Sequence, residues 1–446
     1  MVMITSRAHI EFSILIRLTA GGVYTSVANG GCVRPESCEC PSTRSNGSYD
    51  VTDGPAPTSP SSGRLPAGIW ALGLVSMFMD ISSEMIHGLL PVFLTAVMGA
   101  SAEMIGLIEG IGEATASISK LFSGWISDKL KKRKALTIVG YGLSALSKPL
   151  FALAPNSSVV LGARFSDRVG KGIRGAPRDA MIGEMVPSRL RGAAYGLRQT
   201  LDTIGAFAGP LIAILLMAQL HDNFRLVFWL ALIPGILAVL VLVFGVREPE
   251  HEAPPLQTPL RIADLKATGP AYWIVVGIGA VLTLARFSEA FLILRAQTAG
   301  LAPAWAPLVL VVMNIVYALS AYPLGALSDR VERKPLLVIG FAVLIAADIV
   351  LAVASDLTTV MVGVAMWGLH MGMTQGLLAA LVADEAPQRL RATAFGVFNF
   401  ISGLSLLLAS LTAGMLWELV GPYATFIAGA AFTALGLVGT AVLLRR

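Results

Sequence analysis

Charged residues are scarce in this sequence. Asp, Glu, Lys and Arg make up 14% of its 446 residues, whereas an average soluble domain carries about a quarter. So low a charge content argues against a soluble globular protein of this length.

Cysteine and histidine are scarce as well. Cys32, Cys38 and Cys40 are too few and too clustered for a disulfide framework or a four-ligand zinc site. None of the five histidines forms a pair at metal-ligand spacing. We therefore expect no metal and no other cofactor. No nucleophile–base pair stands out either, so we do not expect an enzyme.

Apolar side chains are abundant, at 55% of all residues. From Ala67 onward, apolar runs long enough to cross a bilayer, about 20 residues each, recur with short breaks. They predict an all-α membrane protein with twelve transmembrane helices. The expected spans are 68–97, 102–124, 135–154, 157–184, 190–218, 224–246, 270–297, 302–326, 334–354, 357–384, 390–418 and 421–444.

Two polar segments divide the chain. Residues 1–66 end in a stretch rich in Ser, Pro, Gly and Asp, which predicts a disordered tail or a start codon placed too early. A second polar segment, 247–269, contains several prolines and separates two sets of six spans. The predicted domains are a six-helix bundle at 67–246, a cytoplasmic linker at 247–269 and a second six-helix bundle at 270–446.

The basic residues predict the orientation in the membrane. Lys and Arg gather in the linker, at the C-terminal end and in the loops after spans 2, 4, 8 and 10, whereas only Arg225 lies on the other side. Cytoplasmic loops carry this excess, so both termini are expected in the cytoplasm of a bacterium, with the chain in its inner membrane. The net charge of +5 then needs no nucleic-acid partner. We expect a monomer in the lipid bilayer.

The two halves repeat each other. The stretch GWISDKLKKRK (124–134) corresponds to GALSDRVERK (325–334), and EMVPSRLRGAAYG (184–196) corresponds to EAPQRLRATAFG (385–396). Parallel repeats of six helices are typical of transporters whose substrate site lies between the two halves.

The stretch RFSDRVGKGIRGAPRDAMI (164–182) is highly charged, and a hydrophilic loop would be its simplest interpretation. The repeat argues otherwise, because its equivalent at 364–382 is the plainly apolar VAMWGLHMGMTQGLLAALV. A membrane helix is therefore predicted, with its charges on one face. A charge at the bilayer centre costs about 2.5–3.5 kcal/mol, so these side chains must face water or partners.

Acidic and basic residues of neighbouring spans could supply those partners. Their number is balanced, which predicts an ion-pair network whose carboxylates take up protons; a purely structural network that fixes helix register is the alternative. The candidate substrate-binding and proton-coupling residues are Asp80, Glu84, Glu109, Glu113, Arg164, Arg168, Lys171, Arg174, Arg178, Asp179, Arg198, Asp202, Arg286 and Glu289.

The second half carries few charges within its spans. His370 is interpreted as a packing residue or, alternatively, a ligand, and Trp367 as part of the core or of a cavity wall. An apolar second-half wall opposite a charged first-half wall suits an amphipathic molecule.

The repeated 124–134 stretch resembles the loop 2–3 signature of the major facilitator superfamily, Gly-x-Leu-x-Asp-Arg-x-Gly-Arg-Lys. The resemblance covers residues 67–446, although Ile126 replaces the Leu and no Gly follows Leu130. It implies a cytoplasmic gate. The residues matched to the gate are Gly124, Asp128 and Arg133, with Gly325, Asp329 and Arg333 in the second copy.

Two further elements are similar to signatures of that family. Span 4 is similar to its Arg-x-x-Gln-Gly-x-Gly element, which implies a proton-transfer role for Arg168, with Lys171 in place of the Gln. Span 5 is similar to the antiporter element Gly-x-x-x-Gly-Pro through Gly205, Gly209 and Pro210.

These observations predict a secondary active transporter that works by alternating access. The first hypothesis is a proton-coupled antiporter that exports a small amphipathic or toxic solute. The alternative is a proton-coupled uptake symporter for an organic anion, which the net charge of span 4 suggests. A sensor or scaffold without transport activity is a third hypothesis, and it is weakened because the sequence shows no attached soluble signalling domain.

Overall fold

A computed structural model describes residues 65–130, 132–187, 190–248, 269–328, 331, 333–386 and 391–444. All of these lie in one compact unit, Ser62–Arg446. Residues 1–64 of the predicted tail and most of the predicted linker lie outside the described residues.

Helices lie at the predicted spans, and most of them begin and end close to the predicted boundaries. The second one, Ala102–Leu130, extends six residues past the predicted end at 124, so most of the stretch 124–134 is helical and not a loop. The first six spans are α2 (Ala67–His87) continued by α3 (Leu90–Val92) and the π-helical turn η1 (Phe93–Val97), α4 (Ala102–Leu130), α5 (Arg133–Leu153), α6 (Ser157–Met185), α7 (Arg191–Gln219), and α8 (Phe224–Leu230) continued by α9 (Leu232–Gly245). The second six are α10 (Pro270–Ala285) continued by α11 (Ala290–Thr298), α12 (Leu308–Ser328) preceded by the 3₁₀ turn η4 (Pro303–Trp305), α13 (Arg333–Val353), α14 (Leu357–Glu385), α15 (Arg391–Leu419) and α16 (Pro422–Leu444).

The described part of the chain is all-helical, as predicted. Within it, nine helical segments are long and apolar enough to cross a membrane. The remaining three of the twelve expected spans are α4 and α6, which carry many of the charged residues discussed below, and α16, whose apolar stretch Pro422–Val438 is shorter. The charge on α4 and α6 therefore sets these two helices apart from the others.

Residues 164–182 lie inside one uninterrupted helix, α6, so the loop interpretation is excluded. The Asn156 side chain caps this helix by accepting a hydrogen bond of 3.1 Å from the Val159 amide. Asp356, 200 positions later, caps α14 in the same way through the Thr359 amide, at 3.0 Å. Hydrogen bonds from Thr359 also hold the pKa of the exposed Asp356 carboxyl below its usual value.

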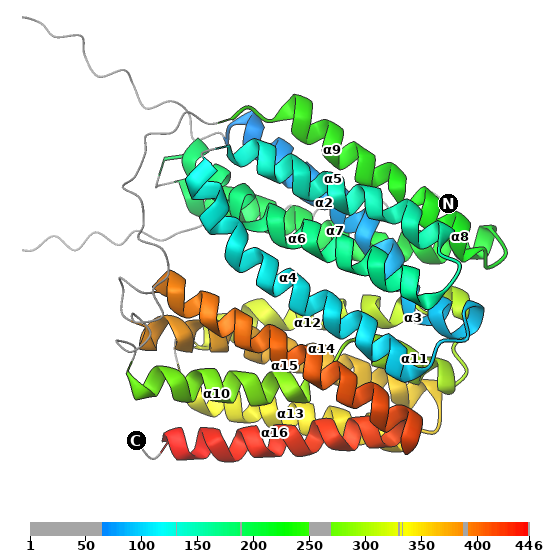
Figure 1. The fold of residues 1–446 in the computed structure, drawn as a ribbon. Helices are drawn as coiled ribbons and strands as arrows, with labels where there is room; N and C mark the ends of the chain where they lie inside the picture. The colour runs from blue at the N-terminus through cyan, green and yellow to red at the C-terminus, as the bar shows by residue number, and fades with distance from the viewer. Residues whose placement is uncertain are drawn as a thin grey trace, which may run out of the picture. The chain divides into compact units, whose positions relative to one another are not determined.

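Each set of helices packs largely against itself. In the first set, α2 packs against α7 and α9, and α6 packs against α4 and α5; in the second, α14 packs against α12 and α13, and α16 packs against α10 and α13 (Figure 1). The long helix α4 also packs against α15 of the second set. Because Ser62–Arg446 forms a single compact unit, the division into two domains stays a prediction.

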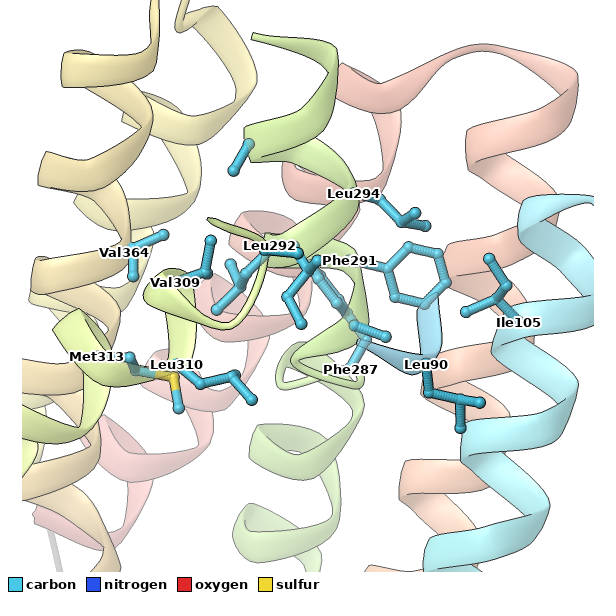
Figure 2. Close-up of a cluster of buried hydrophobic side chains, with 14 of the residues drawn as sticks. Leu90, Ile105, Phe287, Phe291, Leu292, Leu294, Val309, Leu310, Met313 and Val364 are labelled. Atoms are coloured by element: carbon cyan, nitrogen blue, oxygen red, sulfur yellow. The ribbon is translucent and has the colours of Figure 1, made fainter. Parts of the chain in front are cut away.

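The two sets meet through apolar side chains at the ends opposite the basic loops. Figure 2 shows Leu90 of α3 and Ile105 of α4 beside Phe291 of α11, all in one buried cluster. Nearby, the Ala102 amide donates a hydrogen bond of 3.2 Å to Glu418 at the end of α15. At this end, the two sets of helices are tightly packed against each other.

Candidate functional site

A central cavity of about 620 Å³ lies between the two sets of helices. A second cavity of about 1030 Å³ adjoins it, since the two share six lining residues, among them Glu84, Lys171 and Asn314. Ligand pockets of drug-sized molecules span roughly 300–1,000 Å³. The connected space is therefore large enough for a small organic solute.

Two arginines of α6 make ion pairs with acidic residues of α4. Arg164 lies 2.5 Å from Glu109, and Arg168 lies 3.1 Å from Glu113. Gly112 of α4 leaves room for both arginine side chains, because a Cβ there would lie 3.2 Å from Arg164 and 3.4 Å from Arg168. The structure thus brings together the acidic face of α4 and the basic face of α6.

His87 joins these pairs to α2. One ring nitrogen lies 3.3 Å from Glu84, and the other lies 3.7 Å from Glu109. Glu84, His87 and Glu109 all line the central cavity. A continuous path of ionisable groups therefore runs from α2 through α4 to α6 along one wall.

The predicted antiporter element brings α7 against that path. A Cβ at Gly205 would lie 2.5 Å from the Met77 carbonyl oxygen, and one at Gly209 would lie 2.8 Å from the Glu84 Cβ. These two glycines therefore permit a close approach of α7 to the part of α2 that carries Asp80 and Glu84. Pro210 is buried in the same stretch of α7.

The adjoining cavity is lined by the remaining predicted charges of the first half. Within α7, Arg198 makes an ion pair with Asp202 one helical turn later. On α6, Arg178 lies 3.0 Å from Asp179 and donates to Ser76 at 2.8 Å. The residues of the predicted set that line this cavity are Asp80, Glu84, Lys171, Arg174, Arg178, Asp179, Arg198 and Asp202.

One buried ion pair was missed in the sequence analysis. Lys148 of α5 lies 2.9 Å from Asp167 of α6 and donates to Ser83 of α2 at 3.1 Å. Asp348 occupies the equivalent position on α13, 200 residues later, and is fully buried. Neither Asp348 carboxyl oxygen has a hydrogen-bond partner among the described residues.

Aromatic and aliphatic side chains form much of the second-half wall. Phe287, Trp367 and Phe398 line the central cavity, and the rings of Phe287 and Trp367 are 5.3 Å apart. Trp367 therefore lies in the cavity wall. His370, by contrast, is fully buried and lies 2.8 Å from the Gly340 carbonyl oxygen, which fits a packing role.

The few charges of this wall lie where a helix is interrupted. Arg286 and Glu289 occupy the break between α10 and α11, and both line the central cavity. The Ser288 amide in this break donates to the Ser410 hydroxyl of α15 at 3.2 Å. The break thus presents two charged side chains to the space between the two sets of helices.

The predicted gate is only partly described. Arg133 lies 2.6 Å from Glu184, which ties the start of α5 to the end of α6. Gly325 lies in α12. Gly124, Asp128, Asp329 and Arg333 lie, wholly or in their side chains, outside the described residues.

Comparison with known proteins identifies the family. The sequence matches the Major Facilitator Superfamily over residues 72–404 and 278–446. It is 33% identical to an uncharacterized MFS-type transporter of Methanocaldococcus jannaschii, over 82% of this chain and 92% of the relative. The chain therefore belongs to the Major Facilitator Superfamily and is a multi-pass membrane transporter.

A more distant relative agrees with this assignment, and a solved structure has a similar fold. The inner membrane transport protein YajR of Escherichia coli is 23% identical over 82% of this chain and 81% of its own. The crystal structure of a POT family transporter in complex with 5-aminolevulinic acid superimposes with a TM-score of 0.72 at 14% identity, over 85% of this chain and 96% of that one. The structural likeness shows a shared fold.

Proposed function

We propose that this transporter is a proton-coupled antiporter that exports a small amphipathic solute from a bacterial cytoplasm. The observation that carries the proposal is the path of ionisable groups along the cavity wall, in which Glu84, Glu109 and Glu113 each contact a basic side chain. A carboxylate that gains a proton no longer attracts its cation. Protonation would therefore release a basic residue next to the bound solute.

The energy of one proton is sufficient for useful export. A proton that moves down about 100 mV and one pH unit releases about 3.7 kcal/mol. For an electrically neutral solute exchanged for one proton, this supports a solute gradient of roughly five hundredfold. Proton coupling is thus adequate without a second energy source.

The packing of α7 supports export as the direction. Gly205 and Gly209, which match the antiporter element, lie directly against the part of α2 that carries Asp80 and Glu84. In this proposal, α7 moves together with the protonation state of these carboxyl groups. The charged wall binds the polar part of the solute, and the wall with Phe287 and Trp367 binds its apolar part.

The distribution of basic residues in the sequence supports a location and an orientation. We infer a bacterial inner membrane, cytoplasmic termini and a monomer, supported by the gathering of Lys and Arg in alternate loops. Cysteine scanning of the linker 247–269 with an impermeant thiol reagent tests the orientation. Labelling in everted vesicles and not in right-side-out vesicles is expected.

The solute is sought first by a resistance and growth screen of a deletion strain across drugs, metals, metalloids and organic acids. Compounds that reveal a phenotype are then added to everted vesicles with an established proton gradient. An antiporter dissipates the gradient on addition of its substrate. We expect Glu84→Gln and Arg168→Ala to abolish this response in a folded, membrane-inserted protein, since each removes a charge from the path.

A matched control is available on α4. Glu103 lies in the first turn of that helix and is exposed, so Glu103→Gln removes the same charge outside the path and should leave the response intact. Full transport by Glu84→Gln would remove this residue from the mechanism.

Uptake of an organic anion by proton symport is the second candidate. It is favoured by the excess of basic over acidic residues on α6, which holds five against two between Arg164 and Asp179. Right-side-out vesicles distinguish the two directions. Accumulation of the solute in these vesicles under an inward proton gradient would support symport and contradict export.

A further inference from the structure

Three charged residues that line the central cavity lie outside its ion pairs. Its acidic residues Glu84, Glu109 and Glu113 contact His87, Arg164 and Arg168, respectively. The charged residues that remain are Lys171, Arg286 and Glu289. Among the described residues, none of these three forms an ion pair. Two cations, Lys171 and Arg286, and one anion, Glu289, therefore lie outside these contacts.

The two unpaired cations come from different halves of the protein. Lys171 lies on α6, is exposed to the cavity and lines both connected cavities. Arg286 lies at the break between α10 and α11, on the second-half wall. An unpaired basic side chain at a membrane-embedded cavity is costly unless water or a ligand solvates it. Because neither side chain forms an ion pair among the described residues, each can bind an anionic group of a ligand.

Apolar surface lies next to Arg286. Phe287 follows it in sequence, and Trp367 stacks at a tilt against Phe287 with ring centroids 5.3 Å apart. Phe398 and Met371 continue this part of the lining. Rings and thioether groups of this kind bind flat, apolar bodies. The wall thus offers a cation and an aromatic surface side by side.

We propose that the solute is an amphipathic organic anion. Its anionic group binds Lys171 and Arg286 together, and its apolar body lies against Phe287, Trp367 and Phe398. This inference rests on the proposed transport function, because it names the substrate of the same cavity, but it holds for either direction of transport. It also gives the anion a role in bringing the two halves together, since each half supplies one of its cations.

Three probes of one shape and different charge test the proposal. Binding of 2-naphthoate, its neutral amide 2-naphthamide and the cation 2-naphthylmethylammonium to the purified full-length protein is measured by isothermal titration calorimetry. A hydrogen bond to a charged group contributes about 1.5–3 kcal/mol, which corresponds to a factor of about ten or more in affinity. We expect 2-naphthoate to bind at least that much more tightly than the other two probes.

Variants of Lys171 and Arg286 test whether these two residues bind the anionic group of 2-naphthoate. Lys171→Gln and Arg286→Gln should each weaken 2-naphthoate by about tenfold and leave 2-naphthamide unchanged, whereas Lys171→Arg should retain binding. Lys134→Gln is the control, because Lys134 binds the Val243 carbonyl oxygen at 2.8 Å outside both cavities. If a glutamine variant fails to fold, the charge reversal Lys171→Glu provides the second test, since it should favour the ammonium probe over 2-naphthoate.

Several results would overturn the proposal. They are equal binding of the three probes, absence of binding of 2-naphthoate, and unchanged 2-naphthoate affinity in both glutamine variants. Tighter binding of the zwitterion 2-naphthylalanine that depends on Glu289 would assign a zwitterionic solute instead. The antiport proposal is tested separately, because a protein that binds 2-naphthoate as expected but exchanges no protons in vesicles contradicts antiport and leaves the anion site standing.

Discussion

At the scale of single residues, the two halves differ most clearly at positions 148 and 348. Lys148 is fully buried and paired with Asp167, whereas its equivalent Asp348 is fully buried without a hydrogen-bond partner among the described residues. Asp167 in turn corresponds to Trp367, which lines the cavity. The two positions that form a buried ion pair in the first half are therefore occupied by a lone acid and an aromatic residue in the second half.

We expect Lys148→Met to destabilise the protein strongly. The substitution leaves buried Asp167 with only the more distant Arg168, at 3.9 Å, and breaking a buried ion pair costs up to about 3–5 kcal/mol. The double variant Lys148→Met/Asp167→Leu should recover most of the loss, because it removes both charges. Thermal unfolding in detergent, followed by fluorescence-detected size-exclusion chromatography, measures the effect.

Asp348→Asn supplies the matched control for that experiment. The amide has the shape of the carboxyl group, and no opposite charge among the described residues is left unpaired by the change. Little change in the melting temperature is expected. A Lys148→Met variant as stable as the wild type would show that the pair contributes nothing to the fold.

The sequence predicted most of the charged site because repeats and helical spacing carry that information. Spacing by four residues placed Glu109 with Glu113 on one helix face, and the charged face of α6, with Arg164 and Arg168, was predicted to pair with acidic residues of neighbouring spans. The individual pairs were not predicted. Lys148 was missed because it is a single cation in an otherwise uncharged stretch of its span. The offset of 200 residues to Asp348 was the available signal, since a charge at both equivalent positions is unusual inside a membrane.

At the scale of helices, glycine controls how closely α4 and α15 approach. A Cβ at Gly106 would overlap the Ser410 carbonyl oxygen, and one at Gly414 would lie 2.6 Å from the Ala102 carbonyl oxygen. The contact therefore depends on small residues from both helices, as is common between membrane helices. Each glycine meets backbone of the other helix, which cannot move aside without shifting that helix.

Gly106→Ala should accordingly lower stability and impair transport together. The added methyl group forces the two helices apart, and overpacking of this kind costs about 1–3 kcal/mol. Gly142→Ala in α5 is the control, since a Cβ there would meet no described atom within 4 Å. Alanine is a better helix former than glycine by about 1 kcal/mol, so the control should be as stable as the wild type or more so.

The melting temperature and the proton-gradient response are measured for both alanine variants. A Gly106→Ala protein with wild-type values of both would contradict the close approach of α4 and α15.

Helix ends were predicted more accurately than helix interruptions. The polar loops that follow α6 and α12 mark where those helices end. The caps Asn156 and Asp356 were not predicted, although Asn and Asp are common at helix starts. The break between α10 and α11 contains no proline or glycine, the residues that would have predicted a helix interruption. It is accompanied by a tertiary contact, the hydrogen bond from the Ser288 amide to Ser410, and such contacts cannot be derived from local sequence.

At the scale of the whole transmembrane region, the repeat and its asymmetry have different consequences. The repeat fixes the arrangement of the helices, because equivalent segments of the two halves form equivalent helices. The asymmetry fixes the chemistry, because ion pairs fill one wall of the cavity and aromatic side chains much of the other. A transporter that used both halves in the same way would have no reason to concentrate its charges on α2, α4, α6 and α7.

Alternating access requires the tightly packed end of the two sets to separate during transport. At this end, a Cβ at Gly88 would lie 2.8 Å from the Pro307 Cβ, whereas the two Cβ atoms of a disulfide are about 3.8 Å apart. A small outward shift therefore permits a cross-link between Gly88→Cys and Pro307→Cys, after Cys32, Cys38 and Cys40 are replaced by serine. We expect oxidation to stop transport in vesicles and a reducing agent to restore it.

Two controls show whether a loss of transport is caused by the cross-link between positions 88 and 307. Each single cysteine variant should keep its activity under oxidation, which excludes a direct effect of the oxidant. A cross-link between Ala71→Cys and Gly245→Cys joins α2 and α9 within the first half, where a Cβ at Gly245 would lie 3.2 Å from that of Ala71, and should leave transport unchanged. Complete cross-linking of positions 88 and 307 with undiminished transport would mean that this end never opens, and the alternating-access mechanism would fail with it.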